Sequence, residues 1–310
     1  MVRYITKRLL MLIPVLIGVT FLVYAILYFS PGDAARLAAG DTADAATVEA
    51  VRVELGLDKP LVVQYFNYMK NLLHGDMGRS YTTHREVAKT LMDAFPNTVK
   101  LSFWAVLISI VIALPIGIIS AIKQYSALDY IGMVGALLGA AAPNFWLGLM
   151  LIIVFALNLH WLPSGGMQGW KSYILPAITI GVANAALVTR MTRSAMLEVI
   201  RQDYINTARA KGISERQVII HHALKNALIP VVTVVGLQFG ATLGGAAVTE
   251  TIFAWPGIGR VLVDAIRAKD TPLVLGGVII LAVVFTVVNL AVDILYAFID
   301  PRIKAQYKRK

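Results

Sequence analysis

Six long apolar runs constrain the fold of this chain more than any other feature. They cover residues 9–29, 101–122, 131–159, 173–188, 229–248 and 273–298. A helix needs about 20 apolar residues to cross a bilayer core of about 30 Å. The runs therefore predict an all-α membrane protein with six transmembrane helices, the third of which is kinked at Pro143.

The composition favours a membrane protein and disfavours a soluble one. Charged residues make up 15% of the 310 positions and apolar residues 58%, so too few charges remain to cover a globule of this size. The 28 Lys and Arg against 18 Asp and Glu give a net charge of +10, but the basic residues gather at the ends of the apolar runs. That placement indicates membrane topology rather than nucleic-acid binding. The first run is longer than the apolar part of a signal peptide, which predicts a retained helix.

The positions of Lys and Arg also predict the orientation. They cluster before the first run, at residues 190–225 and after residue 300, whereas the loops on the other side hold few. Because cytoplasmic loops carry an excess of Lys and Arg, both termini are expected in the cytoplasm. The predicted divisions are residues 1–30, a first helix with a basic cytoplasmic start; 31–96, an extracytoplasmic helical subdomain inserted between the first two helices; 97–300, a core of five helices with a cytoplasmic loop at 190–229; and 301–310, a basic cytoplasmic tail.

A polar segment, residues 203–230, separates the fourth and fifth apolar runs. Lys211 followed by Gly212 is typical of a helix end with a left-handed cap residue, a conformation that glycine adopts at little steric cost. Ser214 and Gln217 form a capping-box pattern for a second helix, which is expected to end before Pro230. Two helices joined at a glycine suit the docking of a partner protein, and a solvated amphipathic loop is the alternative.

The extracytoplasmic subdomain is expected to contain helices at residues 47–55 and 61–73, where apolar residues have helical spacing. A turn follows at residues 75–81, and it combines two Gly residues with Asp76, Arg79 and Tyr81. Polar and aromatic side chains on a shaped turn suit a transient protein interface. The alternative is that this turn only seals the outer mouth of the membrane helices.

The predicted fifth membrane helix has two contrasting faces. Glycine recurs at residues 236, 240 and 244, which predicts close packing against a neighbouring helix. Almost opposite lie Gln238, Thr242 and Thr249. Together with Asn144 beside the predicted kink, they are candidates for the lining of a water-filled path, and hydrogen bonding between helices is the alternative. On the last helix, Asp293 is expected to pair with another helix or to cap one.

The sequence contains no signature of nucleotide hydrolysis or of catalysis. It has no Gly-x-x-x-x-Gly-Lys-Ser/Thr loop and no His-Glu-x-x-His, and its five His residues form no ligand cluster. It shows no pair of intramembrane carboxylates and no activated nucleophile. We therefore expect no catalytic residue, metal site or cofactor in this chain. Energy for its activity is expected to come from a gradient or from a partner protein.

Short motifs are spread over nearly the whole chain. They include Pro31-Gly32-Asp33, Leu55-Gly56-Leu57-Asp58, Gly75-Asp76-Met77-Gly78, Pro143-Asn144-Phe145-Trp146, Trp255-Pro256-Gly257-Ile258-Gly259 and Asp300-Pro301-Arg302. In this combination the chain resembles the inner-membrane permease subunits of bacterial ABC importers, in the branch that serves dipeptides, oligopeptides, glutathione and nickel. The Glu-Ala-Ala-x-x-x-Gly loop of that family corresponds to residues 206–212, where Asn206 and Thr207 replace Glu and the first Ala.

The resemblance implies a type I importer permease without an ATPase site of its own. Its partners would be a second, similar permease, two ATPase subunits that bind ATP and Mg, an extracytoplasmic binding protein and the lipid of a bacterial inner membrane. The implied ATPase-coupling residues are Asn206, Thr207, Ala208, Lys211, Gly212, Ser214 and Glu215. The candidates for the translocation path are Asn144, Gln238, Thr242 and Thr249, and those for binding-protein contact are Asp76, Arg79 and Tyr81.

A small peptide is the cargo that the resemblance favours, and glutathione or a nickel chelate could use the same scaffold. An ion-coupled secondary transporter is the main competing class. It is disfavoured because the sequence shows no internal inverted repeat and no acidic residue in the middle of a membrane run. An intramembrane enzyme fits less well still, since the catalytic groups are lacking.

Overall fold

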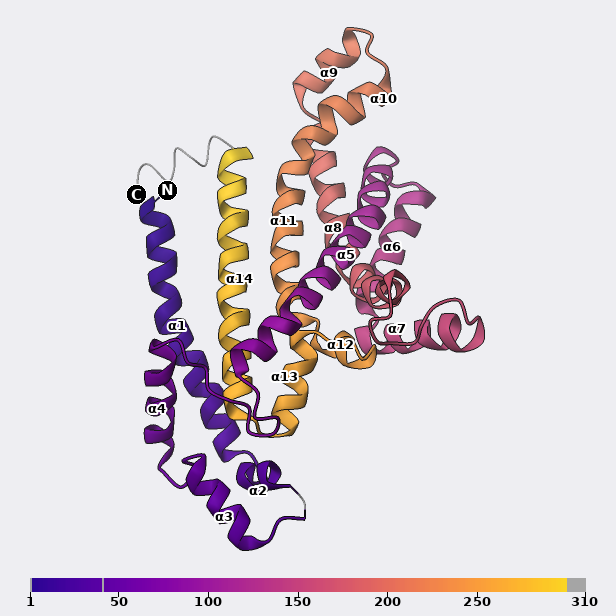
Figure 1. The fold of residues 1–310 in the computed structure, drawn as a ribbon. Helices are drawn as coiled ribbons and strands as arrows, with labels where there is room; N and C mark the ends of the chain where they lie inside the picture. Colours follow the sequence, from indigo (N-terminus) through magenta and orange to yellow (C-terminus); the bar gives the residue numbers. More distant parts are fainter. Residues whose placement is uncertain (1, 41, 300–310) are drawn as a thin grey trace.

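The molecule is an array of long helices with smaller helices at its two ends. The computed structural model describes residues 2–40 and 42–299, and these ranges hold helices, no strand and one isolated bridge between Arg79 and Glu86. The long helices are α1 (Val2–Phe29), α5 (Val87–Ile122), α8 (Ile174–Ile200), α11 (Leu224–Gly245) and α14 (Thr271–Ile299), and Figure 1 shows them crossing the array. The predicted tail, residues 301–310, lies outside the described residues.

The structure supports the six predicted membrane spans. Five helices are long and apolar enough to cross a membrane, and a bent pair of helices supplies the sixth span when it is taken as one. The pair consists of α6 (Ala127–Ala141) and α7 (Asn144–Leu151), which continues as the π-helix η1 (Ile152–Asn158), and its two halves meet at 98°. Pro143 has no N–H and forces Ala142 into an extended conformation, with φ −69° and ψ 124°. The predicted kink is confirmed.

One end of the array, here called the subdomain end, carries α2 (Ala34–Ala39), α3 (Ala45–Glu54) and α4 (Leu61–Leu73) (Figure 1). The helices predicted at residues 47–55 and 61–73 are confirmed by α3 and α4. The carboxylate of Asp33 starts α2 by accepting a hydrogen bond from Ala35 N at 3.0 Å, and Asp44 starts α3 in the same way. α5 begins at Val87, so residues 87–96 of the predicted subdomain are the first turns of a membrane helix.

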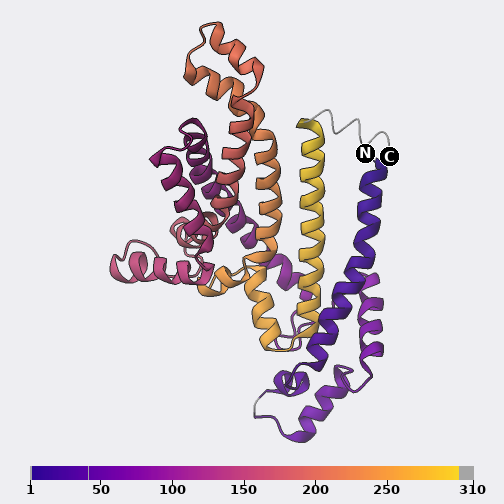
Figure 2. The same ribbon diagram turned by 180° about the vertical axis from the view of Figure 1, so that it is seen from behind.

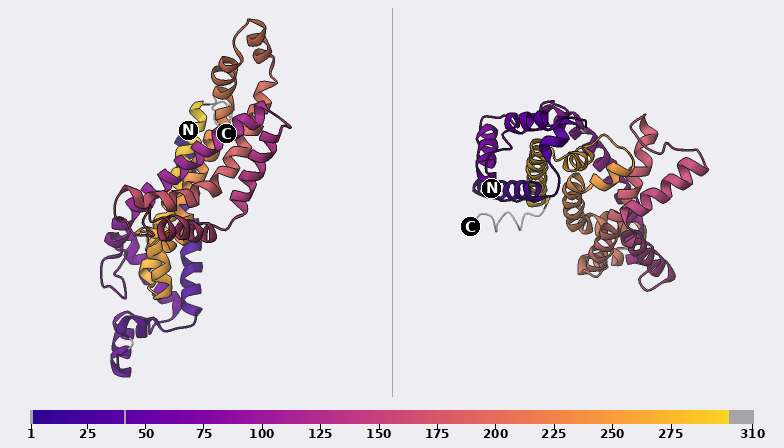
Figure 3. Two further views of the ribbon diagram at one scale, coloured as in Figure 1. Left: turned by 90° about the vertical axis from the view of Figure 1, so that its right-hand side faces the viewer. Right: turned by 90° about the horizontal axis from the view of Figure 1, so that it is seen from below.

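The opposite end, here called the loop end, carries α9 (Asp203–Ala210) and α10 (Glu215–Gln217). The start of α1 and the end of α14 lie toward the same end (Figures 1 and 2), and these two helices pack on each other. Seen from below in Figure 3, the subdomain gathers beside α1 while α7 points away from it. The two ends of the array are therefore built from different parts of the chain.

The most extensive helix packing joins α5 and α8, and we call this contact the α5–α8 seam. Small buried side chains line it: Ser102, Ala105, Ser109, Ala113 and Gly117 on α5, and Ala177, Gly181, Ala185, Thr189 and Thr192 on α8. A Cβ atom on Gly117 would lie 2.7 Å from Cβ of Thr192, and one on Gly181 would lie 2.8 Å from the backbone oxygen of Ala105. Small residues let the two backbones approach, which is how helices associate in lipid.

α11 packs on α14 through two of the three glycines of the predicted ridge. A Cβ atom on Gly236 would collide with Val292, and one on Gly240 would lie 3.3 Å from Cγ1 of Val288. The ridge is confirmed at these two positions. At Gly244 no described atom lies within 4 Å of the added Cβ, so this glycine is not part of the contact.

α1 is held to α14 by a charged pair. Arg8 pairs with Asp293 at 2.8 Å, and the Tyr4 hydroxyl donates to the same carboxylate oxygen at 2.8 Å. The expected pairing of Asp293 with another helix is confirmed. These two interactions place Asp293 of α14 next to the basic start of α1.

Two short helices, α12 (Ala247–Ile252) and α13 (Ile258–Arg267), connect α11 to α14. The buried carboxylate of Glu250 on α12 accepts hydrogen bonds from Thr98 Oγ1 of α5 at 2.7 Å and from Arg260 N of α13 at 3.0 Å. Trp255 Nε1 donates to the backbone oxygen of Asn97 at 3.1 Å. The connection is therefore fixed on α5 by buried polar contacts.

The seam predicts the outcome of enlarging a glycine. Gly181→Val places side-chain atoms against the backbone of α5, and overpacking of this kind costs about 1–3 kcal/mol. We expect a lower thermal unfolding temperature in detergent and a lower yield. Gly135→Val is the matched control, because no described atom lies within 4 Å of a Cβ there. Equal behaviour of the two variants would contradict close packing at the seam.

Candidate functional site

The loop between α8 and α11 closes through a backbone motif at Gly212. Its φ of +79° lies in the left-handed region, as the sequence predicts. Gly212 N donates to Arg209 O at 2.9 Å, and Ile213 N donates to Ala208 O at 3.4 Å. These two bonds are those of a Schellman motif, which satisfies the last carbonyls of α9 and turns the chain sharply.

The second arm of the loop differs from the sequence prediction in two ways. Ser214 precedes α10, but its side chain makes no capping bond to the backbone; Ser214 Oγ instead donates to Gln217 Oε1 at 3.2 Å. The predicted capping box is wrong, because the two side chains bond each other. The predicted end before Pro230 is also wrong: the chain stays helical from α10 through the π-helix η3 (Val218–Ala223) into α11, which contains Pro230. Proline is tolerated inside membrane helices, where neighbouring groups satisfy the freed carbonyl.

Side chains pin the two arms of the loop together. Arg209 binds Glu215 across the turn through two bonds of 3.0 and 2.8 Å, and these bonds raise the pKa of the Arg209 guanidinium. Asn226 Nδ2 donates to the Tyr204 hydroxyl at 2.8 Å. Bonds within the chain therefore define the shape of the loop.

The predicted coupling residues divide between the two faces of the loop. Asn206, Thr207, Lys211, Gly212, Ser214 and Glu215 are exposed, whereas Ala208 is buried. Ala208 belongs to an apolar cluster with Ile205, Val218, Ile219, Ala223 and Met196. This cluster joins both arms to the end of α8, so the exposed face is carried by a packed base.

The polar face of α11 lies against α8. Gln238 Nε2 donates to Asn184 O at 3.0 Å, and Asn184 Nδ2 donates to Thr242 Oγ1 at 3.1 Å. Sequence reasoning missed Asn184 because one amide in an uncharged run gives no periodic signal. Gln238 Oε1 is buried and has no partner among the described residues. The structure thus brings three polar side chains together, and their role in a translocation path stays a prediction.

The other two path candidates lie elsewhere. Thr249 belongs to α12, beyond the end of α11 at Gly245, and is buried. Its predicted alignment with Gln238 and Thr242 is wrong, because a helical period cannot be extended across a helix break. Asn144 occupies the first turn of α7 and is half-buried.

The predicted binding-protein contacts lie at the subdomain end. Asp76 and Arg79 are exposed, and Asp76 Oδ1 shapes the turn by accepting a hydrogen bond from Gly78 N at 2.8 Å. Tyr81 is half-buried and lines a cavity of about 290 Å³ that reaches Pro272 at the start of α14. The turn therefore presents two charged side chains outward and one aromatic side chain toward the core.

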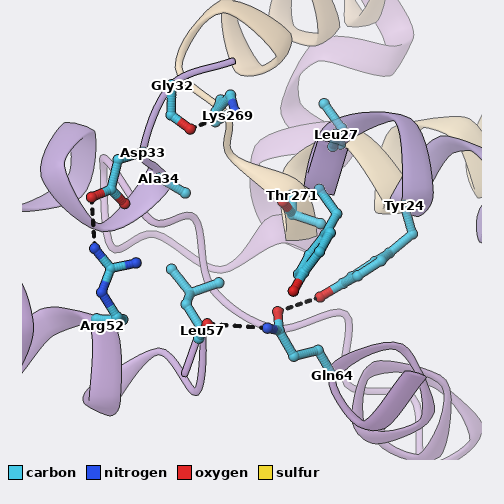
Figure 4. A pocket seen from close by; sticks show the side chains of 11 residues that line it. Tyr24, Leu27, Gly32, Asp33, Ala34, Arg52, Leu57, Gln64, Lys269 and Thr271 are labelled. Carbon is cyan, nitrogen blue, oxygen red and sulfur yellow. Dashed lines mark hydrogen bonds and ion pairs between the residues drawn. The ribbon is translucent and has the colours of Figure 1, made fainter. Parts of the chain in front are cut away.

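A second cavity, of about 300 Å³, lies where α1, the subdomain and the start of α14 meet (Figure 4). On one wall the Tyr24 hydroxyl donates to Gln64 Oε1 at 2.6 Å, which joins α1 to α4. On the other wall Arg52 of α3 pairs with Asp33 at 2.7 Å. Over residues 2–40 and 42–299, no group of three or more His, Asp or Glu side chains could hold a metal ion.

Known proteins share this arrangement. Residues 113–305 match the family of binding-protein-dependent transport system inner membrane components, and residues 1–102 match the N-terminal region of these membrane components. The chain belongs to this family. It is the permease subunit of an ABC importer, and family membership places it in a complex with ATPase subunits and a binding protein, as a multi-pass protein of the inner membrane. ATP hydrolysis belongs to the partner subunits, so the permease itself is non-catalytic.

Named relatives are similar over almost the whole permease. It is 45% identical over 304 residues to the glutathione transport system permease protein GsiC of Pectobacterium atrosepticum, which covers 98% of this chain and 99% of that protein. GsiC of Escherichia coli (strain K12) is 44% identical with the same coverage. A solved structure of the MetNI methionine ABC transporter, inward facing, has a TM-score of 0.60 and 18% identity over 68% of this chain and 96% of that chain. At this identity the likeness shows the fold, which is the predicted type I importer fold.

The Schellman turn predicts that Gly212→Pro uncouples the permease. Proline fixes φ near −65° and removes the N–H that binds Arg209 O, so the loop cannot keep its shape. Coupling energies of about 1–3 kcal/mol correspond to about 5–150-fold effects, and we expect uptake and substrate-stimulated ATP hydrolysis to fall by at least about tenfold.

Transport, membrane insertion and assembly of the complex are measured side by side. We expect insertion and assembly to persist in Gly212→Pro. Gly212→Ala should fall between wild type and Gly212→Pro, since alanine in the left-handed region costs about 1–2 kcal/mol. Gly244→Ala is the neutral control. Unchanged stimulation of ATP hydrolysis in Gly212→Pro would reject Gly212 as a coupling hinge.

The polar contact between α8 and α11 predicts a transport defect separate from a folding defect. We expect Gln238→Leu and Thr242→Val to slow uptake by about fivefold or more while yield stays within about twofold. Gly240→Leu should instead lower yield, because it collides with α14. Thr233→Val is the control, since its hydroxyl bonds only its own helix. Normal uptake by the first two variants in an intact complex would make the polar face purely structural.

Proposed function

We propose that this permease forms the membrane path of an ATP-driven importer for a small peptide of the glutathione class. A binding protein would deliver the cargo at the subdomain end, and ATPase subunits would act at the loop end. The high similarity to glutathione transport system permeases over nearly the full length supports this class of cargo. The grouping of Gln238, Thr242 and Asn184 supports it as well, because neutral amides and hydroxyls can exchange hydrogen bonds with peptide groups.

The observation that carries the proposal is the preformed loop at Gly212. Its exposed face stands on an apolar base that packs on the end of α8, and its second arm continues into α11 without a break. An ATPase that moves this loop therefore moves α8 and α11 together. Arg193 of α8 binds Asp129 of α6 through bonds of 2.8 and 2.7 Å, which adds a third helix to the moving body.

The distribution of basic residues supports an orientation for the proposed importer. The loop end carries Arg209, Lys211 and Arg216, together with Lys7 and Arg8 at the start of α1. An excess of basic residues favours the cytoplasmic side, so we place both termini and the loop in the cytoplasm. The subdomain then lies outside, with Asp76 and Arg79 exposed toward the binding protein.

Reconstitution in proteoliposomes with the ATPase subunits, a second permease and the binding protein tests this function. We expect binding protein loaded with glutathione to stimulate ATP hydrolysis and uptake by about tenfold over a dialanine or nickel–histidine load. Vanadate should stop uptake and a protonophore should not. Uptake that survives vanadate and fails with the protonophore would contradict an ATP-driven importer, and equal import of dialanine would contradict the glutathione class.

A further inference from the structure

Two adjacent residues of opposite charge are buried between α13 and α14. Lys269 is 7% exposed and Asp270 is 0% exposed. No ion pair joins either of them to another described residue. Burying a charge is costly unless hydrogen bonds compensate it. The hydrogen-bond partners of Lys269 and Asp270 therefore show which segments the two side chains fix in place.

Lys269 holds the beginning of the subdomain. Its ammonium group donates to the carbonyl oxygens of Ser30 and Gly32, the latter at 2.7 Å, and Figure 4 shows the side chain reaching the Gly32 carbonyl. Gly32 has a φ of +109°, and a Cβ there would lie 3.2 Å from Cε of Lys269. The chain leaves α1 at this turn, so Lys269 ties the end of α1 to the start of α14.

Asp270 holds the end of the subdomain. Its Oδ2 accepts hydrogen bonds from Ser80 Oγ at 2.5 Å and from Thr82 Oγ1 at 3.2 Å, and Ser80 is 1% exposed. Its Oδ1 accepts a bond from Leu273 N at 3.4 Å, which caps α14. Ser80 lies in the turn that leads into α5 at Val87.

Lys269 and Asp270 therefore bind the turn after α1 and the turn before α5, and Asp270 caps the start of α14. We call the pair the Lys269–Asp270 clamp. Exposed Arg79 sits next to buried Ser80 in the chain, so a force on the outer surface of the turn acts directly on the clamp.

Beyond the clamp the contacts continue to the loop end. α14 packs on α11 at Gly236 and Gly240, and α11 runs without a break into the loop around Gly212, here called the coupling loop. Buried hydrogen bonds and close backbone contact transmit displacement because neither can deform gradually. One connected set of rigid contacts thus joins the subdomain to the loop.

We propose that the Lys269–Asp270 clamp transmits the docking of the loaded binding protein from the subdomain to α14 and from there to the coupling loop. Both residues are positioning residues that touch neither cargo nor ATP. The inference rests on the proposed function, in which the subdomain receives the binding protein. It assigns to the clamp the step between docking and stimulation of the ATPase.

Ser80→Ala and Lys269→Met test the clamp in the reconstituted complex. Ser80→Ala removes one bond to Asp270, together with the bonds of Ser80 Oγ to Thr83 N and Thr82 Oγ1 within the turn, and leaves the cap of α14 intact. Lys269→Met keeps the side-chain length but removes the donors. We expect stimulation of ATP hydrolysis by loaded binding protein to fall by about tenfold, while basal hydrolysis, assembly and affinity for the binding protein stay within about twofold.

Lys269→Arg, which keeps the donors, should recover stimulation. Thr90→Ala is the matched control, since its hydroxyl donates to the backbone oxygen of Glu86, the N-cap residue of its own helix. Full stimulation in both test variants would overturn the proposal, and so would a parallel loss of assembly or of binding-protein affinity, which would make the clamp a purely structural support. The wild-type complex separates the two hypotheses: if no loaded binding protein stimulates it, the proposed function fails, whatever the variants do.

Discussion

The close approach of α5 and α8 is the contact on which the rest of the structure depends. In lipid, apolar burial does not drive helices together, and side chains no larger than threonine let the two backbones make dense contact instead. α8 continues into the loop around Gly212 at one end of the array. In the first half of α5, Thr98 donates to Glu250 and so fixes the connection between α11 and α14. The two ends of the array are therefore both fixed to the α5–α8 pair.

The two ends use different physical means. At the loop end, a backbone turn at Gly212 stands on an apolar cluster, so the exposed surface is free to meet a partner. At the subdomain end, buried polar side chains such as Lys269 and Asp270 hold backbone and hydroxyl groups. Apolar packing is not directional, whereas buried hydrogen bonds fix a single geometry. The permease thus combines an exposed face on an apolar base at one end with a hydrogen-bonded junction at the other.

The parts of this fold that local sequence determines could be predicted. Bilayer thickness sets the length of each apolar run, Pro143 marks a break, and Gly212 marks a turn, since each acts through its own backbone. Patterns extended across a boundary failed: Thr249 left its predicted face because α11 ends before it. Residues whose partners are distant in the sequence gave no signal, and Asn184 is the clearest case, because its role exists only where α8 meets α11.

The bend between α6 and α7 has a consequence for what counts as a complete folding unit. Lipid cannot form hydrogen bonds with the backbone groups that a helix break frees, so such breaks belong against protein or water. Pro143 is exposed in the single chain and supplies no N–H to the carbonyls before it. The surface around the bend is thus unsuited to lipid. The lifetime of the isolated permease in a bilayer should therefore be shorter than that of the permease within the assembled transporter.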